Sequence, residues 1–210
     1  SFMMLIPINH FRRLNTMIQT EGALGAGNYW GSVPSFSINT TVFSRMLYMR
    51  MPRMLREGAR YHVSARANRK EMMFSSDEMK ELFLSVLKEA KMKYDFHIEN
   101  FCIMGNHVHF IIRPGFGISL SSIMKWLLGV FAIRFNKHFN LTGHVWGERF
   151  HSRIIESMRE YLAIFFYIDE NPVMARLVGR IEDWLYGRFH LRERGCEWLL
   201  SSPAAWADLP

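Results

Sequence analysis

Between about Met51 and Pro172, the spacing of apolar residues switches repeatedly between a strand period and a helix period. Side chains alternate between two faces along a strand, whereas a helix brings residues three and four positions apart onto one face. The pattern predicts strands at 60–66, 96–104, 106–113 and 149–157, and helices at 75–90, 119–138 and 158–170. This β-α-β-β-α-β-α order favours an α+β fold, a ferredoxin-like antiparallel sheet with helices on one face and an additional C-terminal helix.

The first two predicted helices have clear sequence signals. Ser75 and Glu78 have the spacing of a capping box, which marks a helix start. Apolar residues then follow at helical spacing in each helix: Met79, Leu82, Phe83, Val86, Leu87 and Ala90 in the first, and Ile123, Trp126, Leu127 and Val130 in the second. We expect these stripes to face the core.

Length and composition suggest one main domain with an appendage. The chain has 210 residues, of which 49% are hydrophobic, enough for a well-packed core in a domain of about 150 residues. Residues 1–50 are rich in Gly, Asn, Ser and Thr and show no sustained period. We therefore predict an N-terminal extension over 1–50, accessory or poorly ordered, a main domain over 51–195 and a tail over 196–210.

Membrane and secreted classes do not fit this sequence. No run approaches the roughly 18 apolar residues of a membrane span, and the start lacks the pattern of a secretory signal. The two cysteines, Cys102 and Cys196, form no disulfide framework and no Cys-rich zinc motif. These features predict a cytoplasmic protein with no membrane partner.

Positive charge is concentrated near the start of the main domain. The formal net charge is +7. Before Glu71, the charged residues from position 53 onward are Arg53, Arg56, Glu57, Arg60, Arg66, Arg69 and Lys70. A basic stretch of this kind favours a polyanion such as nucleic acid as partner, although a basic face that only improves solubility would look the same.

Two histidines share one face of a predicted strand. His107 and His109 are two residues apart in an apolar run, so their imidazoles project to the same side. Such a pair suits a divalent cation whose remaining ligands are oxygens. The alternative is a pair of half-exposed polar residues that face solvent.

A tyrosine and an asparagine share one face of the last predicted helix. Tyr167 and Asn171 are one turn apart, and Pro172 predicts that the helix ends near Asn171. If this face meets the histidine face, a metal held by His107, His109 and Asn171 could polarise a phosphate that Tyr167 attacks. Glu148 or Glu156 could instead supply the third ligand, and Tyr167 could be a core-edge aromatic beside a simple helix stop.

Three segments together resemble the HUH single-tyrosine (Y1) transposases. They are Met104-Gly105-Asn106-His107-Val108-His109, Thr142-Gly143-His144-Val145-Trp146 with Arg149-Phe150, and Tyr167-Ile168-Asp169-Glu170-Asn171-Pro172-Val173. The most similar branch is the REP-associated tyrosine transposases related to IS200/IS605 elements, which the strand Tyr61-His62-Val63-Ser64-Ala65-Arg66 also resembles. The similarity spans residues 51–190. It departs from the family at Gly105, where proline is usual, and at 184–189, which match the Trp-Pro-Trp-Ser-Ser-Tyr stretch only in part.

This resemblance implies a transposase that nicks and transfers single-stranded DNA near hairpins through a 5′-phosphotyrosine intermediate, with Mg²⁺ or Mn²⁺ as cofactor. By motif matching, His107 and His109 correspond to metal ligands, Asn171 to the third ligand and Tyr167 to the nucleophile, all within a catalytic domain over 51–195. Candidate DNA-binding residues are Arg53, Arg56, Arg66, Arg149 and Arg153. Relatives include dimers that exchange the tyrosine helix and monomers, so a homodimer stays open.

Three other functions are alternatives to this one. A histidine-triad hydrolase would need a third histidine at position 111, which is Ile111. A non-catalytic nucleic-acid module would place aromatic residues on adjacent strands for base stacking, where this chain has His107 and His109. A catalytically inactive, DNA-binding relic of a transposase remains the alternative, because it would have the same sequence motifs.

Overall fold

A computed structural model describes residues 55–68, 71–193 and 198–201. Four strands, β1 (Arg60–Arg66), β2 (Phe96–Ile103), β3 (His107–Pro114) and β4 (His151–Ile155), form one sheet in the order β2-β3-β1-β4 with every neighbouring pair antiparallel. The main helices are α3 (Asp77–Lys93), α4 (Leu120–Phe139) and α5 (Met158–Met174). Two short elements follow, η3 (Ile181–Asp183) and α6 (Arg188–Glu193).

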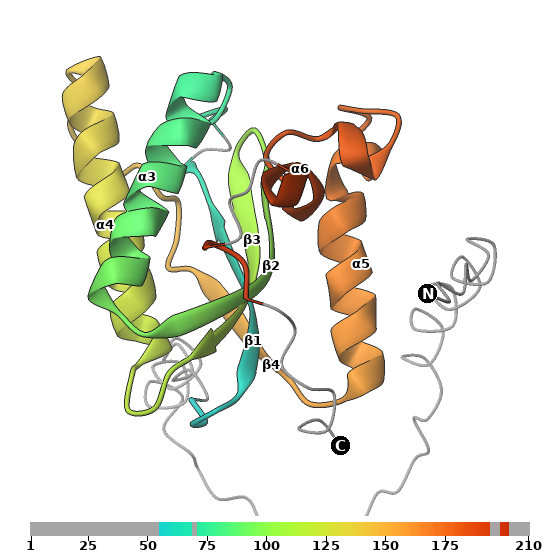
Figure 1. Ribbon diagram of the computed structural model, residues 1–210. Helices are drawn as coiled ribbons and strands as arrows, with labels where there is room; N and C mark the ends of the chain where they lie inside the picture. The colour runs from blue at the N-terminus through green and yellow to red at the C-terminus, as the bar shows by residue number, and fades with distance from the viewer. Residues whose placement is uncertain (1–54, 69–70, 194–197, 202–210) are drawn as a thin grey trace, which may run out of the picture. The chain divides into compact units, whose positions relative to one another are not determined.

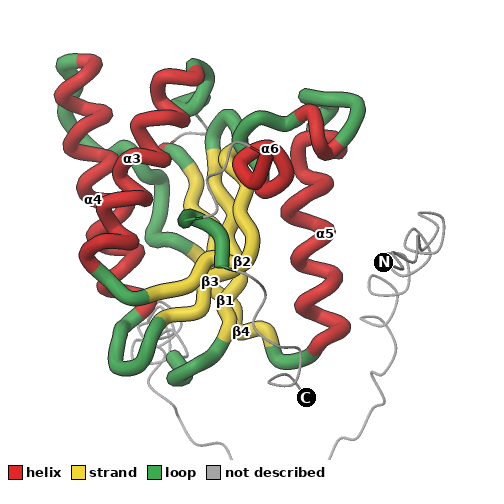
Figure 2. The backbone as a smooth tube through the Cα atoms, in the orientation of Figure 1, coloured by secondary structure: helices red, strands yellow, loops and turns green. Residues whose placement is uncertain are grey.

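The sheet lies between two layers of helices. Helices α3 and α4 cover one face and α5 lies against the other, as Figure 1 shows and as the yellow strands of Figure 2 make plain. The predicted element order and the ferredoxin-like α+β fold are therefore confirmed. The C-terminal helix is the only long helix that the described part of the chain places on its face of the sheet.

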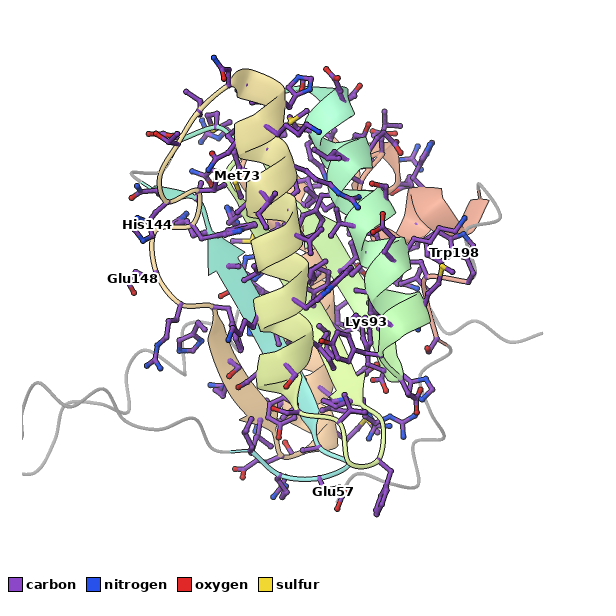
Figure 3. All side chains as sticks on the ribbon, turned by 90° about the vertical axis from the view of Figure 1, so that its left-hand side faces the viewer. Glu57, Met73, Lys93, His144, Glu148 and Trp198 are labelled. Carbon is purple, nitrogen blue, oxygen red and sulfur yellow. The ribbon has the colours of Figure 1, made fainter. Side chains whose placement is uncertain are left out.

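The face under α3 and α4 holds the main core. Val63 of β1 and Phe110 of β3 pair across the sheet and are fully buried. Around the junction with the two helices, aromatic rings pack within 6.4 Å of one another: Phe74, Phe83, Phe131 and Trp146. Figure 3 looks onto α3 and α4, which lie side by side over this core. Burial of these rings packs the helix pair against this face of the sheet.

A second, smaller core lies under α5. It joins Ile164 and Ile168 of the helix to Ile111 of β3 and Cys102 of β2, all of them buried. The α5 helix is therefore packed on the sheet of its own chain by an apolar stripe, and the polar residues beside this stripe lie next to the strands.

Several predicted boundaries differ from the structure. The N-cap of α3 is Ser76, whose hydroxyl accepts from the Met79 backbone N–H, so the predicted capping box with Ser75 and Glu78 is wrong. The strand predicted over 149–157 is shorter, and α5 continues past Pro172 to Met174. Proline lacks the N–H that would donate to the Ile168 carbonyl, and the helix continues because its apolar stripe is packed on the sheet.

Some predictions fall outside the described residues. These are the N-terminal extension, Arg53 and most of the tail over 196–210. Among the helices that the structure describes, none combines the length and apolar character needed to cross a membrane.

Candidate active site

The histidines lie in polar rows that cross the sheet on the α5 side. The antiparallel register pairs Arg66 with His107 and Ser64 with His109, and directly paired residues share a face. On the other side of β1, Ser64 pairs with His151 of β4. Alternation along each strand therefore places the main core on one face and the histidines on the opposite face, as the sequence predicted.

A β-bulge in β2 provides an anchor for α5. The register shifts between Ile98 and Asn100, and the extra residue of a bulge breaks strict alternation. Glu99 and Asn100 both have partners on this side of the molecule: Glu99 accepts from Arg60 Nε at 3.0 and 3.1 Å. Asn100 Nδ2 donates to Asp169 Oδ1 of α5 at 2.9 Å and to the Phe165 carbonyl at 2.9 Å.

Arg188 completes this anchor from the segment that follows α5. Its guanidinium pairs with Asp169 Oδ2 at 3.1 Å and lies 4.6 Å from the centre of the Phe165 ring. Asp169 is 6% exposed, so its carboxylate is stabilised by Arg188 and Asn100 and hardly by water. The partly matched stretch 184–189 therefore has a visible role here: it places Arg188 beside the helix that contains Tyr167.

Tyr167 and the histidines meet on this face. The Tyr167 ring lies edge-on to His109, with ring centres 5.5 Å apart, and His107 lies 4.9 Å from His109 by the same measure. Asn171, one turn further along α5, donates through Nδ2 to the Tyr167 carbonyl at 3.2 Å. The structure thus brings together, within one chain, the four residues that the sequence singled out for chemistry.

The structure adds His62, which sequence reasoning placed only on the polar face of β1. His62 Nε2 lies 3.2 Å from His109 Nδ1, and its ring lies 6.1 Å from that of Tyr167. Its direct strand partner is Ile111, so it is the diagonal neighbour of His109, within reach across an antiparallel pair. Alternation along β1 predicts the face on which His62 lies. Its contact with His109 follows only from the register between β1 and β3.

Burial and nearby charges lower the pKa of all three imidazoles, which favours their neutral form. Burial, followed by the charges of His107, His62 and Arg66, lowers the pKa of His109 to about 3. Burial and then Arg153 lower the pKa of His62 to about 4. Burial and Arg66 also lower the pKa of His107, while a hydrogen bond with Asn171 acts in the opposite direction. A neutral imidazole is the form that can bind a metal ion.

The donor set fits a divalent cation. His107 Nδ1 donates to Asn106 Oδ1 at 2.7 Å and His109 Nδ1 is engaged with His62, so Nε2 of each ring remains as the ligand atom. Asn171 would add an amide oxygen, since its Nδ2 faces the Tyr167 carbonyl. Imidazole and oxygen donors together suit Mn²⁺ or a similar ion. No group of three or more His, Cys, Asp or Glu residues in the described segments could hold a metal, so this site depends on the asparagine.

Four of the candidate DNA-binding arginines lie in described segments, and all four are exposed. Arg66 is beside His107, and Arg153 is the strand partner of His62. Arg153 is paired with Glu160, and Arg56 lies 4.0 Å from Glu156. Arg149 lies just before β4, outside the strand rows that contain the histidines.

The alternative third ligands lie elsewhere. In Figure 3, His144 and Glu148 lie on the outer side of the loop between α4 and β4, away from the helix pair. Glu156 is exposed and donates its backbone N–H to Glu160. Among the predicted oxygen donors, Asn171 is the one that the structure brings to the histidines.

Comparison with known proteins identifies the family of the chain. The family model described as "Transposase IS200 like" matches residues 56–171, a range that includes both histidines, Tyr167 and Asn171. No match was found among curated proteins.

Two solved structures are similar to the chain. One is a REP-associated tyrosine transposase bound to a REP hairpin, with 21% identity, coverage of 70% of this chain and 86% of that chain, and a TM-score of 0.60. The other is a putative transposase from Deinococcus radiodurans R1, with 17% identity, coverage of 58% of this chain and 97% of that chain, and a TM-score of 0.42. The first likeness shows the fold, and the family match covers more than half of the sequence. The chain therefore belongs to the IS200-like family of Y1 transposases.

Proposed function

We propose that this protein is a metal-dependent endonuclease and strand transferase that acts on single-stranded DNA beside hairpins. The observation that supports this most directly is the contact between Tyr167 and His109, with ring centres 5.5 Å apart. His107 lies beside His109 and forms a hydrogen bond with Asn171, so a phenol, two imidazoles and an amide are close to one another. The REP hairpin bound to the similar transposase supports hairpin DNA as the class of substrate.

In this proposal Tyr167 is the nucleophile. Its hydroxyl oxygen attacks the scissile phosphorus, a P–O bond to the tyrosine forms, and the bond from phosphorus to the 3′ oxygen breaks. The phenolic proton is lost and the departing 3′ oxygen gains one, which leaves a free 3′ hydroxyl and a 5′-phosphotyrosine. The new diester keeps the energy of the old one, so a 3′ hydroxyl from another strand can reverse the step without a nucleotide cofactor.

His107, His109 and Asn171 would hold the divalent cation, Mg²⁺ or Mn²⁺. When bound, the ion would neutralise charge that develops on the phosphate. Tyr167 is 42% exposed, so a DNA strand can reach it without opening the core. Arg66, beside His107, would attract the DNA backbone to this face, and Arg53, Arg56, Arg149 and Arg153 are proposed to extend that contact.

The test uses the full chain with single-stranded hairpin DNA labelled at its 3′ end, in Mg²⁺ or Mn²⁺, resolved on a denaturing gel. We expect the label to migrate with the protein, because the 5′-phosphotyrosine retains the fragment with the original 3′ end. Tyr167→Phe should abolish this adduct. Tyr94→Phe is the matched control, since Tyr94 packs against Trp126 on the opposite face.

Two outcomes would contradict the proposal. Cleavage that survives in Tyr167→Phe would show that another group is the nucleophile. Hairpin binding without cleavage, across varied hairpins and both metals, would instead indicate a DNA-binding relic of a transposase.

A further inference from the structure

The structure contains a histidine close to the proposed site with no role in the chemistry described so far. His62 is half-buried in the middle of β1 and stacks beside His109, with ring centres 5.4 Å apart and an angle of 19° between the planes. Its Nε2 lies 3.2 Å from His109 Nδ1, within hydrogen-bonding distance. Two neutral imidazoles in this contact must share one proton along the line between the two nitrogens, because one has to donate and the other to accept.

We propose that His62 is a positioning residue that accepts a hydrogen bond from His109 Nδ1 and so presents His109 Nε2, unprotonated, to the divalent cation. This inference rests on the proposed function, because it assumes that His109 is a ligand. A neutral imidazole has one proton, so a ligand at Nε2 requires that proton at Nδ1. His62 Nε2 is the acceptor at that atom, which places the proton of His62 on its own Nδ1.

The second histidine of the pair has an equivalent arrangement. His107 Nδ1 lies 2.7 Å from Asn106 Oδ1, and an amide oxygen can only accept. His107 therefore has its proton on Nδ1 and an unprotonated Nε2, which is the tautomer proposed for His109. Ligand histidines in metal sites ordinarily donate their second nitrogen to such a partner, and loss of that partner weakens metal binding about 10–100-fold.

The groups around His62 favour an orienting role over direct coordination. Its Nε2 already faces His109, and the three histidines form no group that could hold a metal by themselves in the described segments. Arg153 is its partner on β4, so a positive charge lies on the side away from β3. The Tyr167 ring packs edge-on against it at 6.1 Å. His62 is thus confined between β3, β4 and α5, in a position to fix the rotation of the His109 ring.

The first measurement requires no metal and no variant. Two-bond ¹H–¹⁵N correlation spectra of the metal-free protein, at pH 7.5, distinguish the two tautomers of each histidine. We expect both His107 and His109 to have the proton on Nδ1. A proton on His109 Nε2 would overturn the proposal.

The second measurement is Mn²⁺ affinity, determined by titration with electron paramagnetic resonance of the free ion. We expect His62→Leu, which fills the space but accepts no hydrogen bond, to bind Mn²⁺ about 10–100-fold more weakly than the wild type. His62→Gln retains an acceptor near the position of Nε2 and should restore most of the affinity. His97→Leu is the matched control, because His97 is also half-buried in a strand and bonded through Nδ1, to Ser201 Oγ at 3.0 Å.

The kinetic readout separates positioning from proton transfer. With hairpin DNA, His62→Leu should need about 10–100-fold more Mn²⁺ for half-maximal cleavage, with kcat at saturating Mn²⁺ close to that of the wild type. A fall in kcat with unchanged Mn²⁺ affinity would overturn the proposal, since it would make His62 a base for Tyr167. Unchanged affinity in both His62 variants would also overturn it while the proposed function stands. Absence of Mn²⁺ binding by the wild type would overturn this inference, and the absence of cleavage in both Mn²⁺ and Mg²⁺ would overturn the proposed function.

Discussion

Removal of the Arg188 guanidinium tests how the tyrosine helix is held on the sheet. The side chains of Asp169 and Arg188 are 3% and 18% exposed, and their closest atoms are 3.1 Å apart. Loss of one partner from a buried ion pair costs about 3–5 kcal/mol, because the other charge remains buried. For Arg188→Met we expect a loss of about 3 kcal/mol in the free energy of unfolding. The lower end applies because Asn100 still donates to Asp169.

The stability of this variant should also depend on pH. Burial raises the pKa of Asp169, and the charge of Arg188 opposes that rise. Without Arg188 the pKa rises further, so the variant gains a proton on Asp169 in the folded state as the pH falls. The difference in stability between Arg188→Met and the wild type should therefore be smaller at pH 5 than at pH 7.

The assay is urea unfolding at both pH values, followed by circular dichroism and by tryptophan fluorescence. A double-mutant cycle with Asp169→Asn isolates the pair, and we expect a coupling energy of about 2 kcal/mol. If Arg188→Met lowers the free energy of unfolding by the same amount in the Asp169→Asn background as in the wild type, the ion pair does not stabilise α5. An increase in the stability difference on going to pH 5 would equally refute the argument.

Three further predictions concern the rest of the domain. His62 and His109 have pKa values of about 4 and about 3 in the folded state, below the ordinary 6.5. The unfolded chain therefore binds more protons than the folded protein below pH 6.5. The metal-free protein should lose stability as the pH falls through this range. The loss between pH 7 and pH 5 should reach about 2 kcal/mol for each histidine, measured by urea midpoints, and a constant midpoint would contradict it. Gly129→Ala, in the exposed middle of α4 with nothing within 4 Å of the added Cβ, should stabilise the protein by about 0.5–1 kcal/mol in thermal unfolding. Phe131→Ala should cost about 3–5 kcal/mol, because the fully buried ring contacts Trp146 and three other aromatic rings; a loss below 1 kcal/mol would show that the cluster repacks.

Local periodicity was sufficient to predict most of the fold. The alternation along β1 and β3 is a property of each strand by itself, so Val63, Phe110 and their neighbours could be assigned to the core face before the sheet order was known. The boundaries were less accurate where one residue competes with another for the same role, as Ser75 and Ser76 do at the start of α3. The end of α5 was misplaced because packing of the helix on the sheet outweighs the local effect of Pro172.

The candidate site was predictable in its chemistry but not in its anchors. Tyr167 and Asn171 follow from helical spacing, and His107 and His109 from strand spacing, because both pairs are close in sequence. The bond between Asn100 and Asp169 joins residues 69 positions apart, and it depends on a bulge that alternation does not reveal.

By itself, the sequence determined which residues share a face, since that depends only on the geometry of a single strand or helix. It therefore identified two imidazoles on one element and a phenol and an amide on another. Only the tertiary structure decided that these faces meet, that His62 lies diagonal to His109, and that Arg188 and Asn100 hold α5 in place. The physical reason is that strand register and helix docking arise from contacts between distant segments, each favourable only when the others have formed.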